Sequence, residues 1–269
     1  AVDQGISVVV SAGNEATKPV PYTTIGTPAS ASKVITVGAS NGSRNVVSFS
    51  SQGPSLDFRV DPDIVAPGFQ IVGPLASGGV MDKAYNALVG ISIQDYIVLS
   101  GTSMSAPVVG GAVALLKQQF PDASPHALRA ALLESATDLG ENESIYTQGS
   151  GLINVGKAGE LLSQSKTASG YELISSLPRA SDKPVEFFQP LVFPGDKSEL
   201  RLSFITGAEG TITWEVNESL DPFIEFDTTP TVLNSADYFE KNILLEIPLN
   251  TPLGDYSGYI RYTAFGKSY

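Results

Sequence analysis

The chain has 269 residues and a formal net charge of −12, an acidic balance that disfavours nucleic acids and anionic membrane surfaces as partners because it repels phosphate groups. It contains no cysteine and one histidine, which excludes disulfides, thiolate catalysis and cysteine zinc sites and argues against a histidine metal site. Apolar residues make up 42% of the chain, enough for a sizeable core, but no run of them is long enough to span a bilayer.

The pattern of the first part of the chain predicts an α/β fold. Short, nearly continuous apolar runs are typical of strands covered on both faces of a sheet, and the clearest runs are residues 6–11 and 34–37. Residues 75–95 contain glycine and are weakly patterned, so we expect them to form a surface loop. Further short strand candidates, separated by Gly and Pro, are residues 46–51, 63–65 and 97–100.

Two helices are predicted next. Residues 104–120 are apolar nearly all round, so we expect this helix to be buried on every side, with Gly110 and Gly111 allowing close backbone packing. Ser124, which is followed by a proline, is an N-cap signal for an amphipathic helix that runs to about residue 139.

The composition changes after about residue 168. The stretch SQSKTASG, residues 163–170, is typical of a linker. Beyond it, short runs of alternating apolar and polar residues are separated by turn signals, which predicts a β-sandwich with Trp214 in its core. We therefore predict an α/β domain over residues 1–168 and an all-β sandwich domain over residues 169–269.

Several hydroxyl groups in SGTSMSAP, residues 100–107, precede the apolar helix. Ser103 is expected where a strand turns into this helix, among free N–H groups and the positive end of the helix dipole, which suits a nucleophile that develops an oxyanion. Read alone, the stretch favours the simpler role, in which Ser103 or Thr102 caps the helix. Asn14 follows a buried strand at the sheet edge where α/β proteins place their sites, but asparagine is also a common turn residue.

Six motifs decide between these roles. They are SAGNE (11–15), ITVGAS (35–40), SFSSQGP (48–54), APG (66–68), GTSMSAP (101–107) and GLINV (151–155). In order and approximate spacing they resemble the motifs of the subtilisin-like serine peptidases. The resemblance covers about residues 1–160 and implies the C-terminal half of that parallel-sheet catalytic domain, followed by a fibronectin-III-like β-sandwich.

The resemblance implies a role for each matched residue. Ser103 is expected to be the nucleophile of a serine endopeptidase that cleaves proteins or peptides through an acyl-enzyme. Asn14 is expected to donate its side-chain amide into the oxyanion hole together with the Ser103 N–H, and Thr102 to support this asparagine. One wall of the pocket for the residue before the scissile bond is expected to be formed by Ser11, Ala12 and Gly13.

The resemblance also implies a secreted or cell-surface protein. No cofactor is expected. Calcium is common in the family, but the sequence assigns no site for it, and we expect no catalytic metal.

The residues that would activate Ser103 are missing from the matched motifs. In this family the chain order is Asp, His and then Ser, so the first two belong upstream of SAGNE. Residues 1–14 look like the end of a helix that runs into a buried strand, and we expect a missing N-terminal half, in a longer chain or in a partner chain. His126 begins a predicted surface helix and is expected to face solvent. The chain alone is therefore expected to be inactive, and the alternative is a non-catalytic, subtilase-derived scaffold that binds proteins or cell-surface material.

Overall fold

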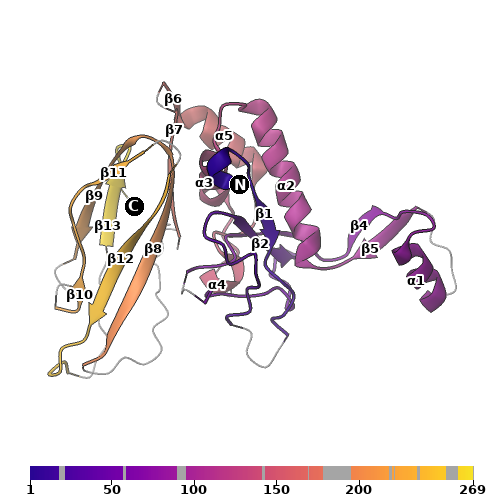
Figure 1. Cartoon of the computed structure of the whole chain (residues 1–269), viewed down its shortest axis with the longest axis horizontal. Helices are drawn as coiled ribbons and strands as arrows, with labels where there is room; N and C mark the ends of the chain where they lie inside the picture. The colour runs from indigo at the N-terminus through magenta and orange to yellow at the C-terminus, as the bar shows by residue number, and fades with distance from the viewer. Residues whose placement is uncertain are drawn as a thin grey trace.

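The computed structural model describes residues 1–17, 22–56, 59–89, 95–140, 143–168, 170–177, 195–217, 220, 222–234, 237–252 and 260–268. Three parallel strands form the sheet of the α/β part, in the order β1-β2-β3. They are β1 Val9–Ser11, β2 Ile35–Ser40 and β3 Ile64–Pro67 (Figure 1). Every residue of β2 is buried, as its apolar run predicts for a central strand covered on both faces.

The long helix α2, Thr102–Gln119, packs against all three strands of this sheet. Its opposite face is open, since the side chain of Val108 is 39% exposed and that of Leu115 62% exposed. The prediction that this helix is buried on every side is therefore wrong within the described residues. A Cβ built on Gly110 or Gly111 would have no heavy atom within 4 Å, so these glycines are not sites of close packing either.

Two further helices, α3 Pro125–Ser135 and α5 Val155–Ser165, lie beside α2 (Figure 1). The predicted cap of α3 is confirmed, because the Ser124 hydroxyl accepts a hydrogen bond of 3.1 Å from Ala127 N. The helix ends earlier than predicted, at Ser135. The α/β part also contains the short helices η1 Val2–Gln4 and α4 Ile145–Gln148.

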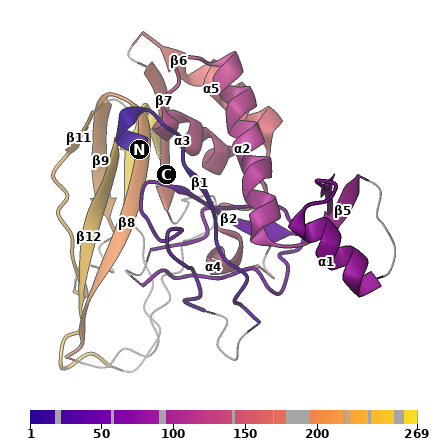
Figure 2. The ribbon, with the colours of Figure 1, turned by 45° about the vertical axis from the view of Figure 1, so that its right-hand side comes forward.

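An antiparallel hairpin of β4 Ile71–Pro74 and β5 Tyr96–Leu99 leads into α2, and its connection contains α1 Val80–Val89. Figures 1 and 2 show this arm projecting from the body on the side away from the C-terminal strands β8, β9 and β12. The prediction of a plain loop over residues 75–95 is therefore wrong. The strand predicted at 46–51 is also wrong, because only Val46 makes an isolated bridge before the chain turns.

The C-terminal part contains two antiparallel sheets, in the orders β10-β12-β8-β7-β6 and β11-β9-β13-β14. Their facing side chains form one hydrophobic cluster that includes Trp214, Phe204 and Tyr262, so the predicted core position of Trp214 is confirmed. The strands are β6 Lys166–Thr167, β7 Gly170–Leu177, β8 Lys197–Ala208, β9 Gly210–Val216, β10 Ile224–Glu225, β11 Thr231–Leu233, β12 Tyr238–Glu246, β13 Ile260–Ala264 and β14 Lys267–Ser268.

Strand β8 belongs to two hydrophobic cores at once. Phe204 points into the cluster between the two antiparallel sheets, and Ile205, the next residue, joins the cluster that contains α2, α3 and the parallel sheet. Both side chains are 0% exposed, because successive residues of a strand point to opposite faces. The prediction of a linker at residues 163–170 is wrong for its described residues, since residues 163–165 end α5, residues 166–167 form β6 and residue 170 begins β7. The antiparallel sheet packs directly on α3.

His126, in the first turn of α3, is buried and only 6% exposed. The expectation that it faces solvent is therefore wrong, because the antiparallel sheet of β7 and β8 covers α3. Among the described residues, the Nε2 atom of His126 has no hydrogen-bond partner. Burial lowers the pKa of His126 below its usual 6.5, and the neighbouring cations Arg129 and Lys33 lower it further. The neutral imidazole is thus the form that the fold favours.

We expect this burial to make stability depend on pH. The unfolded chain binds a proton at His126 near pH 6.5, above the folded pKa, so the free energy of unfolding falls as the pH decreases through this range. His126→Gln should show a smaller decrease than the wild type in urea unfolding between about pH 7 and pH 5. Other titrating groups are common to both proteins, so equal decreases would contradict the assignment.

The double role of β8 predicts that the two parts unfold together. Ile205→Ala removes fully buried methyl groups and should lower the free energy of unfolding by about 2–5 kcal/mol, in a single transition monitored by circular dichroism of both helices and strands. Val232→Ala is the control, since Val232 is 74% exposed and should change stability by less than about 0.5 kcal/mol. Separate transitions for helices and strands would show that the parts are independent.

Candidate active site

The candidate site lies where the carboxyl ends of β1 and β3 meet the first turn of α2. Gly68, just after β3, accepts a hydrogen bond of 2.8 Å at its carbonyl from Gly101 N, and donates one of 2.9 Å to the carbonyl of Ser40 at the end of β2. A side chain at Gly68 would collide with the buried hydroxyl of Ser105 in α2. The glycine of the APG motif therefore lets the start of the helix sit directly on the sheet edge.

Thr102 and Asn14 are joined by two hydrogen bonds across 88 residues of sequence. The Oδ1 atom of Asn14 accepts from Thr102 N at 2.9 Å and lies 3.1 Å from Thr102 Oγ1. Because a backbone N–H can only donate, the oxygen of the amide must face Thr102, and this fixes the orientation of the amide group. The Nδ2 group of Asn14 therefore points away from Thr102 as a free donor.

Ser103 is exposed in the first turn of α2, where the N–H groups of the helix have no partners within the helix. The N-cap residue is Gly101, and it makes no side-chain cap. The hydroxyl of Thr102 bonds to Asn14 and Gly13 instead. Neither hydroxyl thus has the capping role that the stretch suggested when read alone.

Two nitrogen atoms lie near one point beside Gly101. A Cβ built on this glycine would lie 3.4 Å from Asn14 Nδ2, 3.7 Å from Asn14 Oδ1 and 3.8 Å from Ser103 N. The side-chain amide of Asn14 and the backbone nitrogen of Ser103 are therefore neighbours at the positive end of α2.

A pocket of about 650 Å³ is lined by residues on both sides of Asn14 in the sequence and by residues 22–28. Ser11, Ala12 and Gly13, which the resemblance placed in a pocket wall, do line it. The remaining lining residues are Val10, Glu15, Tyr22, Thr23, Thr24, Ile25, Gly26, Thr27 and Pro28.

Glu15 and Ser51 form a contact at the pocket that sequence reasoning missed. The Ser51 hydroxyl donates to Glu15 Oε2 at 2.9 Å and accepts from Glu15 N at 3.1 Å. Gly13 has a φ of 115°, and a Cβ there would lie 2.7 Å from Ser51 Oγ and collide with the Glu15 carboxylate. The motifs SAGNE and SFSSQGP contain these residues, but nothing in the sequence showed that they touch.

The described residues contain no cluster of three or more His, Asp or Glu side chains that could hold a metal ion. Within the same residues, no helix is both long and apolar enough to cross a membrane. His126, the single histidine of the chain, lies buried in α3 among Arg129, Lys33, Asp3 and Asp237, none of which belongs to the candidate site.

Comparison with known proteins gives several relatives of the first part of the chain. It is 37% identical over 158 residues to "Serine protease AprX" of Bacillus subtilis (strain 168), over 56% of this chain and 34% of that protein. It is 35% identical over 156 residues to "Subtilisin DY" of Bacillus licheniformis, over 58% of this chain and 47% of that protein. Among solved structures, the patellamide maturation protease PatA aligns with a TM-score of 0.47 at 27% identity, over 61% of this chain and 54% of that one.

The chain spans between a third and a half of the length of these curated relatives. The subtilase (Peptidase S8) family model matches residues 1–151, which is more than half of the chain. The chain therefore belongs to the subtilase family.

Proposed function

We propose that this chain is the serine-bearing part of a subtilisin-like serine endopeptidase. In this proposal Ser103 is the nucleophile, the Asn14 amide and the Ser103 N–H form the oxyanion hole, and Thr102 holds Asn14 in place. The pocket bounded by Ser11, Ala12 and Gly13 receives the substrate residue before the scissile bond. The substrates are proteins or peptides, as membership of a peptidase family suggests.

One observation carries this proposal, namely that Asn14 Nδ2 and Ser103 N both lie near one point beside Gly101, next to an exposed serine. Preorganised donors of this kind stabilise the negative charge that develops on a carbonyl oxygen when a nucleophile attacks it. The hydrogen bonds from Thr102 to Asn14 mean that the amide does not have to reorient as the charge develops. A serine without such donors nearby would support only a capping or structural role.

The reaction then follows acyl transfer. The Ser103 oxygen attacks the substrate carbonyl carbon as a base removes its proton, and the carbonyl oxygen becomes an oxyanion held by the two N–H groups. The carbon–nitrogen bond breaks as the leaving amine takes up the proton, which leaves an ester on Ser103. Water attacks this ester by the same route and releases the acid.

In this proposal the base comes from polypeptide outside this chain, because the matched motifs include neither the Asp nor the His motif of the family and His126 is buried in α3. We propose that the missing N-terminal half of the peptidase domain supplies the Asp and the His, either upstream or as a partner chain. Two observations support this: the relatives are two to three times longer than the matched region, and an apolar face of α2, with Leu115 at 62% exposure, is open.

We further propose that residues 1–168 belong to the peptidase domain and that residues 169–269 are a β-sandwich of the fibronectin-III-like kind. The shared cluster between the two antiparallel sheets supports the second part. Family membership supports a secreted or cell-surface location. The proposed chemistry needs no cofactor, and calcium has no assigned role in it.

Labelling of the full-length protein with a fluorophosphonate probe tests the nucleophile. Ser103→Ala should abolish labelling, because the probe forms its bond with the activated serine. Ser105→Ala is the matched control, since the Ser105 hydroxyl is buried without a hydrogen-bond partner and its loss should leave labelling unchanged. Labelling that survives Ser103→Ala would refute the assignment, and a wild type that never labels would favour the non-catalytic scaffold.

The chain by itself should hydrolyse peptides negligibly. Catalysis that remains in subtilisins after removal of the triad is only about 10³–10⁴-fold over water, a value measured in that family rather than on this chain. Turnover of a peptide substrate by the isolated chain at the rate of an intact serine peptidase would contradict the proposal that the base lies elsewhere.

Asn14→Ala should lower kcat of the full-length enzyme by about 10²–10³, the size of the effect already measured for the matching donor of a subtilisin. KM should change little, because the donor acts on the oxyanion and not on the bound substrate. An increase in KM at unchanged kcat would assign Asn14 to substrate binding instead.

A further inference from the structure

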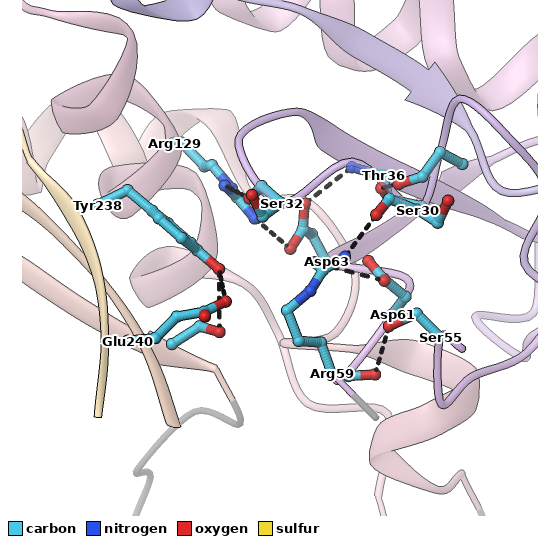
Figure 3. Close-up of polar contacts among 12 residues, drawn as sticks. Ser30, Ser32, Thr36, Ser55, Arg59, Asp61, Asp63, Arg129, Tyr238 and Glu240 are labelled. Carbon is cyan, nitrogen blue, oxygen red and sulfur yellow. Dashed lines mark hydrogen bonds and ion pairs between the residues drawn. The ribbon is translucent and has the colours of Figure 1, made fainter. Parts of the chain in front are cut away.

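Four buried ionisable side chains form a cluster next to residues 29–32, the segment that follows pocket residues 22–28 (Figure 3). They are Arg59, Asp61, Asp63 and Arg129, with 5%, 2%, 1% and 3% of their surface exposed. Charged groups are costly to bury unless they are paired. The cluster is balanced when both carboxylates are ionised, but nothing in the proposed chemistry uses it.

Each arginine of the cluster bridges a carboxylate and a backbone carbonyl. Arg129 donates from Nη2 to Asp63 Oδ1 at 2.8 Å and from Nη1 to the Ser32 carbonyl at 2.8 Å. Arg59 donates from Nη2 to the Ser30 carbonyl, and its Nη1 lies 3.8 Å from Asp61 Oδ2. Figure 3 shows both guanidinium groups directed toward this segment.

The carbonyl that Arg59 holds belongs to the backbone that shapes the pocket. Ser30 N donates to the carbonyl of Gly26 at 3.1 Å, and Gly26 N donates to the carbonyl of Ala12 at 3.3 Å. Gly26 and Ala12 both line the pocket. A continuous series of hydrogen bonds therefore runs from the Arg59 guanidinium through Ser30 and Gly26 to Ala12, two residues before Asn14.

The Arg59 side of the cluster is the weaker of the two. Within the part of the chain that the structure describes, Asp61 Oδ2 has no hydrogen-bond partner, whereas both oxygens of Asp63 accept hydrogen bonds. Burial and the neighbouring Asp63 carboxylate raise the pKa of Asp61 above its usual range, although Arg59 and Arg129 act in the opposite direction. Arg59 donates a hydrogen bond to the Ser30 carbonyl but lies 3.8 Å from Asp61 Oδ2, so the carbonyl is the closer of these two partners of its guanidinium.

We infer that Arg59 is a positioning residue for the pocket, whose guanidinium fixes the Ser30 carbonyl and thereby the pocket-lining segment 22–28. Arg59 itself touches neither the substrate nor the reacting atoms. The inference rests on the proposed function, because the pocket is taken to receive the residue before the scissile bond.

Hydrogen exchange of the full-length protein tests the positioning without any need for activity. Arg59→Met keeps most of the side-chain length but removes the donors, so amides of residues 22–34 should exchange about tenfold faster or more, while those of α5 keep their protection. Lys33→Met is the matched control, because Lys33 is in the same segment but forms an exposed ion pair with Asp3. It should leave exchange in residues 22–34 unchanged.

Peptide hydrolysis by the same proteins tests the link to the site. Substrates with a large residue before the scissile bond should show the effect. For these, Arg59→Met should raise KM about tenfold and change kcat less than about threefold, since small displacements of positioning groups have effects of this size or more. Arg59→Lys keeps the charge and one donor and should restore part of the KM. With glycine at that position the KM of all variants should be similar.

Equal exchange in Arg59→Met and the wild type would overturn the inference, as would a fall in kcat at unchanged KM. If Arg59→Met does not fold, Arg59→Lys provides the second variant. It keeps the positive charge but loses the planar set of donors, and should accelerate exchange in residues 22–34 to a smaller extent. If exchange behaves as expected but the wild type neither hydrolyses peptides nor labels, the proposed function fails while Arg59 keeps its positioning role.

Discussion

The contact between Thr102 and Asn14 is the constraint on which the candidate site depends. It joins the end of the first parallel strand to the beginning of the longest helix, two segments that are 88 residues apart. Thr102 is 0% exposed, so its hydrogen bonds are shielded from water. In such a buried place the loss of one partner leaves a polar group unsatisfied, which costs stability. One contact thereby fixes three things at once: the orientation of the Asn14 amide, the position of the helix start and the exposure of the next residue, Ser103.

The position of α2 in turn depends on the packing beneath it. The parallel sheet and α3 hold the buried face of α2, and α3 is itself covered by the antiparallel sheet through Ile205 and Tyr171. At this edge the Tyr171 hydroxyl donates to Asp122 at 2.8 Å, just before α3. The C-terminal sheets thus support the packing of the α/β part. This explains why residues 203–208 of β8 are buried on both faces, unlike a strand at the surface of an independent sandwich.

The sequence predicted features that follow local rules, such as the apolar run of β2 and the cap of α3. The structure also brings Asn14 and Thr102 into hydrogen-bond contact, while the roles that the motifs imply for these residues and for Ser103 stay predictions. The sequence did not reveal that Asp63 pairs with Arg129, since the two are 66 residues apart and charged residues near Gly and Pro usually belong to exposed turns. His126 was misjudged for the same reason: amphipathicity identifies a buried face, but not a second sheet that covers the other one.

The use of arginine in the buried cluster follows from the shape of the segment that it holds. Residues 29–32 lie in no strand, so no neighbouring strand satisfies their carbonyls, and buried carbonyls without donors destabilise a fold. A guanidinium presents several N–H groups in one plane and can donate to a carbonyl and a carboxylate together, as Arg129 does, whereas an ammonium is a compact point charge. A buried ion pair adds little net stability compared with apolar residues of the same size. Its contribution here is to fix the orientation of the backbone carbonyls of this segment, because each hydrogen bond accepts only a narrow range of geometries. The cluster is therefore better understood as setting the shape of the backbone beside the pocket than as a source of stability.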